Sequence, residues 1–162
     1  MESRDTVVST LRAWGIPFEL HAHQAAHTIA DCVQMDFITP DVVICKNIFL
    51  CNRQQTQFYL MLLHPDSQFR TAEVSRALGV SRLSFAPDEL LPGMLGLLPG
   101  AVSPLGLLFD TGHRITLLCD RRIRDYPRIA FHPCINTETV VFGGGDFFEK
   151  VLPLMNAVPV WV

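Results

Sequence analysis

Two apolar runs separated by four polar residues constrain the fold of this chain more than any other feature. DVVICKNIFLCN (41–52) and QFYLMLLH (57–64) are rich in β-branched and aromatic residues, and RQQT (53–56) lies between them. Runs of this length on either side of a short polar turn are typical of a β-hairpin. The sequence therefore predicts two strands joined by a tight turn over residues 41–64.

Periodic and capping patterns predict further elements before and after this hairpin. Val7, Leu11 and Trp14 recur on one helical face, and a glycine follows as a stop signal. A T-x-x-D pattern at Thr28 resembles a helix cap. These signals place a helix in 5–15, a strand in 16–23, a short helix after Thr28 and a helix from Thr71 to Gly79.

The second half of the chain begins with a segment rich in proline and glycine. Residues 87–110 are expected to form a brief helix and then a structured loop at 98–106. Later segments predict strands at 114–120, 128–133 and 137–142, a helix from Asp146 and a last strand at 157–162. This order predicts an α+β fold, in which one domain holds a mixed, mostly antiparallel sheet flanked by helices.

Composition excludes several classes of protein. The 162 residues are 49% hydrophobic and 18% charged, which argues against disorder. No apolar run reaches the roughly 18 residues that a membrane span needs, and the N-terminus lacks a secretory pattern, so we expect a cytoplasmic protein without a membrane partner. The five cysteines include no C-x-x-C pair and are expected to be free thiols. A net charge of -3 means that any nucleic acid would be bound by a local patch.

A lysine within the first apolar run is the first candidate site residue. Lys46 and Asn47 interrupt a segment that is otherwise suited to a buried strand. Lys46 could lie on a solvated face of the strand, or it could stand at the mouth of a pocket and pair with an anionic or oxygen-rich ligand. Its position alone leaves both interpretations open.

Two loop motifs are further candidates. In GAVSP (Gly100, Ala101, Val102, Ser103, Pro104), glycine would allow close backbone approach, and free N–H groups could bind an oxygen that gains negative charge during ester hydrolysis. In FHPCINTET (131–139), His132, Asn136 and Thr137 could form a wall of a site or serve as ordinary capping residues. His132 and Cys134 also suggest a Cys–His nucleophile, but their proximity in sequence does not place a base within reach of the thiol.

Metal and nucleic-acid patterns are weaker. His21, His23 and His27, together with a distant H-x-C, do not match a standard zinc spacing, so we expect no metal and no cofactor. Clustered arginines are the best local footprint for an RNA backbone. These possible tRNA contacts are Arg121, Arg122, Arg124 and Arg128.

Taken in order, three motifs resemble a known family. KNIFL (46–50), GAVSPLGL (100–107) and FHPCINTET (131–139) are similar in order and spacing to the YbaK/prolyl-tRNA-synthetase-associated editing family, in particular to its free-standing prolyl-tRNA editing proteins. The likeness extends over nearly the whole chain. It implies the family's α+β editing fold, with residues 1–162 as a single aminoacyl-tRNA editing domain.

The resemblance also implies an activity and its residues. The family hydrolyses the ester of a mischarged tRNA, and alanyl-tRNA(Pro) is the substrate that the motifs favour. Lys46 corresponds to the residue on which activity depends most, the loop from Gly100 to Pro104 is implied to hold the ester, and His132 to line the aminoacyl pocket. The family picture has water attack the carbonyl with help from the 2′-hydroxyl of the terminal adenosine, so no protein nucleophile is needed.

Some alternatives stay open at this point. Cys134 and Glu138 within the histidine motif, and three glycines at 143–145, depart from the family pattern and bear on substrate choice. The chain could clear another small amino acid such as cysteine or serine, or bind aminoacyl-tRNA or a synthetase without catalysis. Prolyl-tRNA synthetase is a possible partner.

Overall fold

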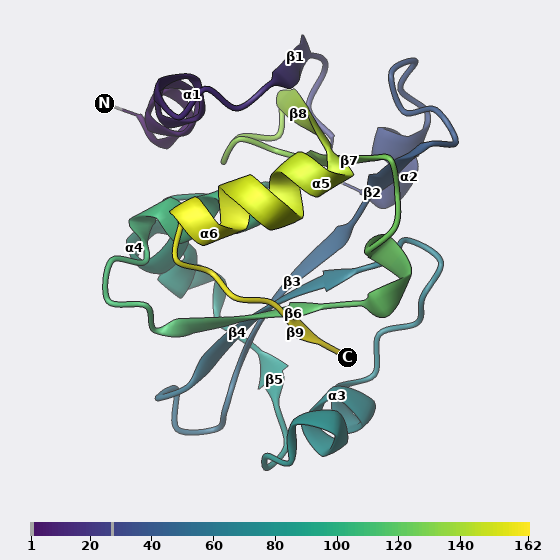
Figure 1. Cartoon of the computed structure of the whole chain (residues 1–162). Coiled ribbons are helices and arrows are strands. Elements are labelled where there is room, and N and C mark those ends of the chain that lie inside the picture. Colours follow the sequence, from purple (N-terminus) through teal and green to yellow (C-terminus); the bar gives the residue numbers. More distant parts are fainter. Residues whose placement is uncertain (1, 27) are drawn as a thin grey trace.

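The computed structural model describes residues 2–26 and 28–162, which form a single α+β domain with two mixed sheets (Figure 1). The first sheet has the order β1-β8-β7-β2, formed by Phe18–Ala22, Glu138–Gly143, Arg128–Phe131 and Val42–Ile44. The second has the order β5-β3-β4-β6-β9, formed by Ser84–Phe85, Lys46–Cys51, Phe58–Leu63, Ile115–Cys119 and Val160–Trp161. The predicted single sheet is therefore two sheets, and β2–β7, β4–β6 and β6–β9 pair in parallel.

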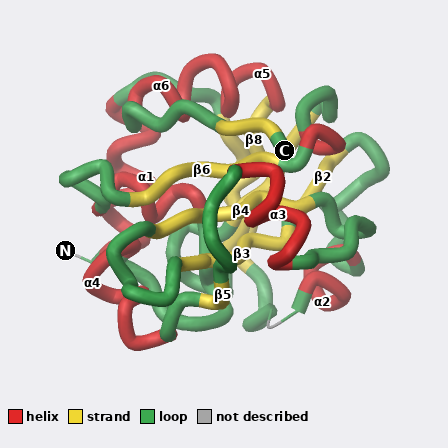
Figure 2. The backbone as a smooth tube through the Cα atoms, turned by 90° about the horizontal axis from the view of Figure 1, so that it is seen from below, coloured by secondary structure: helices red, strands yellow, loops and turns green. Residues whose placement is uncertain are grey.

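The helices lie around these sheets. Figure 2 shows the strands running through the middle of the molecule, with helical segments around them. The helices are α1 (Ser3–Ala13), α2 (Ile29–Val33), α3 (Thr71–Leu78), α4 (Leu91–Leu95), and α5 (Gly144–Asp146), which continues through a π-helical turn into α6 (Leu152–Leu154). None of the helices in the described ranges is both long enough and apolar enough to cross a membrane.

Most of the predicted elements are confirmed. β3 and β4 pair as an antiparallel hairpin from Cys51 opposite Phe58, so the RQQT turn is where the sequence placed it. The Thr28 hydroxyl accepts a hydrogen bond from the Asp31 N–H at 3.1 Å, as expected of a helix cap. Gly79 ends α3 with a φ of +67°, a left-handed conformation that glycine adopts without strain.

The run at 41–52 differs from the prediction in a way that shapes the molecule. It was expected to form one strand, but it breaks at buried Cys45 into β2 and β3, which belong to different sheets. Both sheets then contribute side chains to one hydrophobic core, which includes Val43, Phe49 and Phe131. The break therefore joins the two sheets at the point where Lys46 begins β3.

Three further segments correct the prediction. The loop expected at 98–106 gives way at Pro104 to a 3-10 helix, Pro104–Phe109, because the Ser103 hydroxyl caps it by accepting from the Leu105 N–H. The short edge strand β5 had no recognisable pattern in the sequence. The last helix begins at Gly144 rather than at Asp146, so Gly143 ends β8 and the next two glycines open α5.

Gly144 is expected to be indispensable for this junction. A Cβ atom there would lie 2.2 Å from the Tyr126 carbonyl oxygen, whereas a Cβ at Gly145 would meet nothing closer than 4.0 Å. We expect Gly144→Ala to lower the free energy of unfolding by about 1–3 kcal/mol through this clash. Gly145→Ala, its matched control, should be neutral or stabilising by up to about 1 kcal/mol. Urea unfolding followed by circular dichroism measures both, and equal effects would contradict the account.

Candidate functional site

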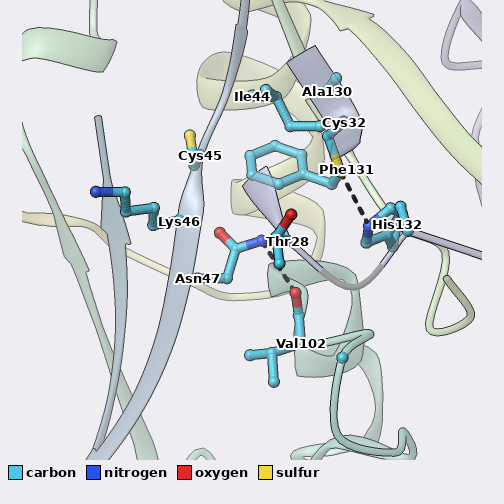
Figure 3. A pocket seen from close by; sticks show the side chains of 12 residues that line it. Thr28, Cys32, Ile44, Cys45, Lys46, Asn47, Val102, Ala130, Phe131 and His132 are labelled. Carbon is cyan, nitrogen blue, oxygen red and sulfur yellow. Dashed lines mark hydrogen bonds between the residues drawn. The ribbon is translucent and has the colours of Figure 1, made fainter. Parts of the chain in front are cut away.

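A cavity of about 230 Å³ lies where β2 passes into β3. It is bounded by β2, β3, the end of β7, the Gly100–Pro104 loop and residues near α2, and Figure 3 shows its side chains. Its lining residues are Ala26, Thr28, Cys32, Ile44, Cys45, Lys46, Asn47, Gly100, Val102, Ala130, Phe131 and His132. The three motifs of the sequence analysis therefore meet at one place.

The size and chemistry of the lining limit what can enter. Side chains such as Ile44, Ala130 and Phe131 are apolar and buried. The polar groups among the lining residues come from the opposite walls, principally Asn47 and His132. A small apolar group flanked by a polar, ester-like group is the ligand that such a lining accommodates.

Asn47 holds one wall of the cavity in place. Its side-chain Nδ2 donates a hydrogen bond to the Val102 carbonyl oxygen at 3.0 Å, which ties the Gly100–Pro104 loop to β3. Its Oδ1 atom is buried and has no hydrogen-bond partner among the described residues. An unpaired buried acceptor costs free energy, so this side chain gains the hydrogen bond to Val102 but leaves its own Oδ1 without a partner among the described residues.

Lys46 and Asn47 point to opposite sides of β3, because successive side chains of a strand alternate (Figure 3). Asn47 is on the side of Phe49, which packs in the core between the sheets, and Lys46 is on the side of Ile48, which packs near α3. The Lys46 ammonium donates to the Ser67 carbonyl oxygen at 3.3 Å. Lys46 thus lines the rim of the cavity, while its ammonium is turned away from the apolar interior.

The buried carboxylate of Asp120 holds the loop around Ser67, to which Lys46 donates a hydrogen bond. Asp120 accepts hydrogen bonds from the Ser67 hydroxyl at 2.8 Å and from the backbone N–H groups of His64 and Arg122, each at 3.0 Å. Burial alone would raise the pKa of Asp120, but these donors together outweigh it and lower the pKa below its ordinary value. The Arg122 guanidinium also donates to the Ser67 hydroxyl, so Lys46 and Arg122 approach the same residue.

His132 is fixed by hydrogen bonds at both ring nitrogens. Its Nδ1 lies 2.9 Å from the Glu138 carbonyl oxygen, which can only accept, so Nδ1 carries the proton. Its Nε2 lies 3.8 Å from the Cys32 Sγ. Burial lowers the pKa of His132, against the effect of the Glu138 hydrogen bond. The ring is therefore neutral near pH 7, with an unprotonated Nε2.

The sequence did not indicate the contacts that Thr139, His23 and Cys32 make around His132. The Thr139 hydroxyl lies 2.7 Å from His23 Nε2 and 3.5 Å from His132 Nδ1, and Cys32 packs against the other edge of the His132 ring. The sequence predicted a strand at 137–142, but nothing local indicated the partners of Thr139. Cys32 is separated by 100 residues from the histidine that it meets.

The GAVSP loop contributes only part of what the sequence suggested. Gly100, with a φ of +89°, and Val102 line the cavity. Ala101, Ser103 and Pro104 are buried beneath it, and Ser103 caps the following 3-10 helix. The N–H groups of Gly100 and Val102 have no hydrogen-bond acceptor within the described part of the chain.

Asn136 lies beside the cavity. It is not among the lining residues found in the described structure, and its side-chain nitrogen would be 3.7 Å from a Cβ added at Gly100. Its carbonyl oxygen accepts from the Ala26 N–H at 3.0 Å. FHPCINTET thus forms one wall through His132 and pairs through its backbone with the segment that carries Ala26.

The buried thiols are poorly suited to act as nucleophiles. Burial raises the pKa of Cys32 and Cys45, and raises that of Cys134 to about 12. Only the thiolate is strongly nucleophilic, so these groups are inert near neutral pH. Cys134 also lies near the Leu95 carbonyl oxygen instead of meeting His132. A Cys134–His132 pair is therefore not formed.

In the described part of the chain, no group of three or more His, Cys, Asp or Glu side chains is arranged to hold a metal ion. His27, one of the residues considered as a ligand, lies outside the described residues. His21 stacks on Phe37 with ring centroids 4.0 Å apart.

The four arginines occupy different surroundings. Arg128 pairs with Asp41 and Glu19, each at 2.9 Å, and its hydrogen bond is the main reason that the pKa of Asp41 is about 2. The Arg124 guanidinium lies 5.3 Å from the centre of the Trp161 ring. Arg121 and Arg122 are exposed, and Arg122 lies nearest to the lysine end of the cavity through Ser67.

His132 predicts a pH dependence of stability. Its pKa is lowered by folding, so the unfolded state binds more protons as pH falls through the ordinary value of about 6.5. The stability that His132 contributes should be fully present above that pH and decline below it. Urea unfolding between pH 5 and 8 tests this, since His132→Gln should flatten the slope. A wild-type slope unchanged in the variant would assign the pH dependence to other groups.

The sequence matches the aminoacyl-tRNA editing domain over residues 23–149. The chain is 30% identical to the prolyl-tRNA editing protein ProX of Acetoanaerobium sticklandii, over 94% of this chain and 92% of the relative. It is 33% identical to prolyl-tRNA synthetase associated domain-containing protein 1 of Danio rerio, over 66% of this chain and 59% of that protein.

A solved structure shares the fold. A candidate trans-editing enzyme for prolyl-tRNA synthetase superposes with a TM-score of 0.73 at 17% identity, covering 99% of this chain and 96% of the other. The family match spans the β3, Gly100–Pro104 and His132 segments that enclose the cavity. The chain belongs to the aminoacyl-tRNA editing domain family.

Proposed function

We propose that this protein is an aminoacyl-tRNA deacylase that acts in trans, hydrolysing the ester of mischarged tRNA, and that Ala-tRNA(Pro) is its preferred substrate. In this proposal residues 1–162 work as one editing domain in the cytoplasm. The observation that carries it is the small apolar cavity beside Asn47 and the Gly100–Pro104 loop, with the only lysine of the N-terminal half of the chain at its rim. The name of the ProX relative supports the assignment to prolyl-tRNA.

The alanine side chain would occupy the apolar part of the cavity. Proline adds a ring to the same backbone, and its amine is tied into that ring. A synthetase site shaped for proline cannot strongly exclude alanine, because a missing methylene changes binding by only about 1–3 kcal/mol. The opposite selection would depend on the walls of the cavity, where the buried side chains of Ile44, Ala130 and Phe131 would admit the alanine methyl group and crowd the proline ring.

Stabilisation of the developing oxyanion is the chemistry that the loop would provide. An activated ester needs positioned donors more than it needs a strong nucleophile. The N–H groups of Gly100 and Val102 are the candidates, since neither is used by a hydrogen bond among the described residues. The bond from Asn47 to Val102 would hold these donors at a fixed distance from β3.

Water would be the attacking group. The thiols nearest the cavity, Cys32 and Cys45, have raised pKa values and are protonated near neutral pH. This supports a route in which water attacks the carbonyl carbon, the 2′-hydroxyl of the terminal adenosine assists, and the ester oxygen leaves with a proton. His132 would form a neutral wall of the aminoacyl pocket, together with the supporting Asn136.

Lys46 would anchor the tRNA end rather than the oxyanion. Its ammonium lies on the outer side of β3 near Ser67 and Arg122, away from the apolar interior. A phosphate or ribose oxygen at the rim would be within reach of such a side chain, and Arg122 with neighbouring Arg121 would extend the cationic surface. Arg124 and Arg128 would contribute less, because Trp161 and two carboxylates already engage them.

Deacylation of a panel of purified esters tests the proposal. Ala-tRNA(Pro), Cys-tRNA(Pro) and Ser-tRNA(Ala) are incubated with the protein, and loss of labelled amino acid is followed. Faster turnover of the alanine ester supports the favoured substrate, and preference for another ester would reassign it. Binding of tRNA without turnover of any ester would contradict the enzyme assignment and leave a module that binds aminoacyl-tRNA, with or without prolyl-tRNA synthetase as partner.

A further inference from the structure

The cavity that the proposed function assigns to the amino acid is called the aminoacyl cavity below. A second cavity, of about 280 Å³, adjoins it and shares Asn47 and Val102 with it. We call it the edge groove; its other walls include Phe85, Ala86, Asp88 and Leu91. Neither the sequence motifs nor the proposed reaction accounts for it. The two cavities therefore adjoin at the hydrogen bond between Asn47 and Val102, so a substrate that occupies the first would bring its next group beside the second.

The edge groove runs along an open strand edge. The Ala86 N–H donates to the Phe49 carbonyl oxygen at 2.9 Å, so the main chain of Phe49 faces β5. Hydrogen-bonding direction alternates along a strand, so the N–H and C=O of Asn47, two residues earlier, face the same way. β5 does not extend far enough to meet them, and outside the sheet ladders no described residue bonds to either group. Asn47 thus offers one donor and one acceptor to the groove.

An exposed aromatic ring completes the groove. Phe85 is 66% exposed and lines this groove from the edge strand β5, with its ring centroid 5.6 Å from that of Phe69. Ala86 and Leu91 supply further apolar surface. A flat, partly apolar ligand with an adjacent acceptor and donor on its edge matches this combination.

From these features we infer that the edge groove binds the terminal adenine of the tRNA, an inference that rests on the proposed function. The amino acid is esterified to the ribose of that nucleotide, so adenosine is the first group outside the aminoacyl cavity. Adenine N1 would accept from the Asn47 N–H, its N6 amino group would donate to the Asn47 C=O, and Phe85 would stack on the base. The negative charge of the Asp88 carboxylate would repel a phosphate group in this groove. The tRNA phosphates would therefore lie on the other side, near Lys46.

Two esters of alanine test the inference. Alanyl-adenosine carries the base, and alanine ethyl ester does not. Phe85→Ala should lower kcat/KM for alanyl-adenosine about 10-fold or more, because base–aromatic stacking is lost, and leave the ethyl ester unchanged. Phe85→Trp should retain the preference for alanyl-adenosine. Val158→Ala, which truncates another exposed apolar side chain, should change neither rate. Equal rates in wild type and Phe85→Ala for both esters would overturn the inference.

Nucleotide binding separates this inference from the proposed reaction. AMP should bind more tightly than GMP in a calorimetric titration, since guanine presents a donor at N1 and an acceptor at position 6. Phe85→Ala should weaken AMP binding about 10-fold. If no ester is hydrolysed but AMP binds in this Phe85-dependent manner, the groove assignment stands while the proposed function fails. If esters are hydrolysed and AMP binds no better than GMP, the groove assignment is overturned.

Discussion

Lys46→Ala is expected to lower kcat/KM for Ala-tRNA(Pro) by about 100-fold, with most of the loss in KM. A hydrogen bond to a charged group contributes about 1.5–3 kcal/mol, which corresponds to roughly 10- to 150-fold in affinity. The Lys46 ammonium lies at the rim of the cavity, and among the described residues it donates only to the Ser67 carbonyl oxygen, so it is available to the tRNA end. Steady-state deacylation kinetics measure the two constants separately.

Lys150→Ala is the control for this variant. Lys150 is the other lysine of the chain; its side chain is 59% exposed, and it pairs with Asp146 at 3.2 Å, in the C-terminal helix. Its loss should leave the kinetics unchanged. The salt dependence of KM should also fall in Lys46→Ala, by about one counterion, if the ammonium contacts phosphate. A large fall in kcat at unchanged KM would instead place Lys46 at the oxyanion and contradict the anchoring role.

Asn47→Asp is expected to reduce kcat by about 100-fold. The side-chain amide donates to the Val102 carbonyl oxygen, and a carboxylate there would face that carbonyl with no proton to share. Leaving a buried acceptor unpaired costs about 1–3 kcal/mol, and a charged one costs more, so the loop would move away from β3. The oxyanion donors at Gly100 and Val102 would then be misplaced, which affects the transition state more than binding.

The control for added charge is Asn156→Asp. Asn156 is exposed and has a φ of +56°, a conformation that aspartate tolerates, so this variant adds the same charge without touching the loop. Its kinetics should match those of the wild type. Asn47→Asp with wild-type kcat would show that the bond to Val102 does not position the catalytic loop.

Local patterns predicted much of the fold. The hairpin at β3 and β4, the cap at Thr28 and the stop at Gly79 depend on residues close in sequence, and each is found where expected. The break at Cys45 could not be predicted, because an apolar run looks the same whether it continues in one sheet or passes into another. The helix can start at Gly144 because a residue without a Cβ fits against the Tyr126 carbonyl oxygen. Tyr126 is 18 residues away in sequence, so no local pattern indicates this contact.

The candidate site was predictable to a similar degree. The motifs led to Lys46, Asn47, Gly100 and His132, which the structure brings together around one cavity. The alternation of side chains in a strand already implies that Lys46 and Asn47 diverge, although the sequence does not say which of them faces inward. Cys32 and Asp120 were missed because their roles arise from contacts with residues more than 50 positions away.

In the proposed function, the cavity beside Asn47 selects the ester by the size and shape of its amino acid. The most direct test is the deacylation of Ala-tRNA(Pro) and Pro-tRNA(Pro) at equal concentration, with spontaneous hydrolysis subtracted. We expect the alanine ester to be cleared at least 100-fold faster than the proline ester, which should be spared. Equal clearance of both esters, or clearance of neither, would contradict this selection.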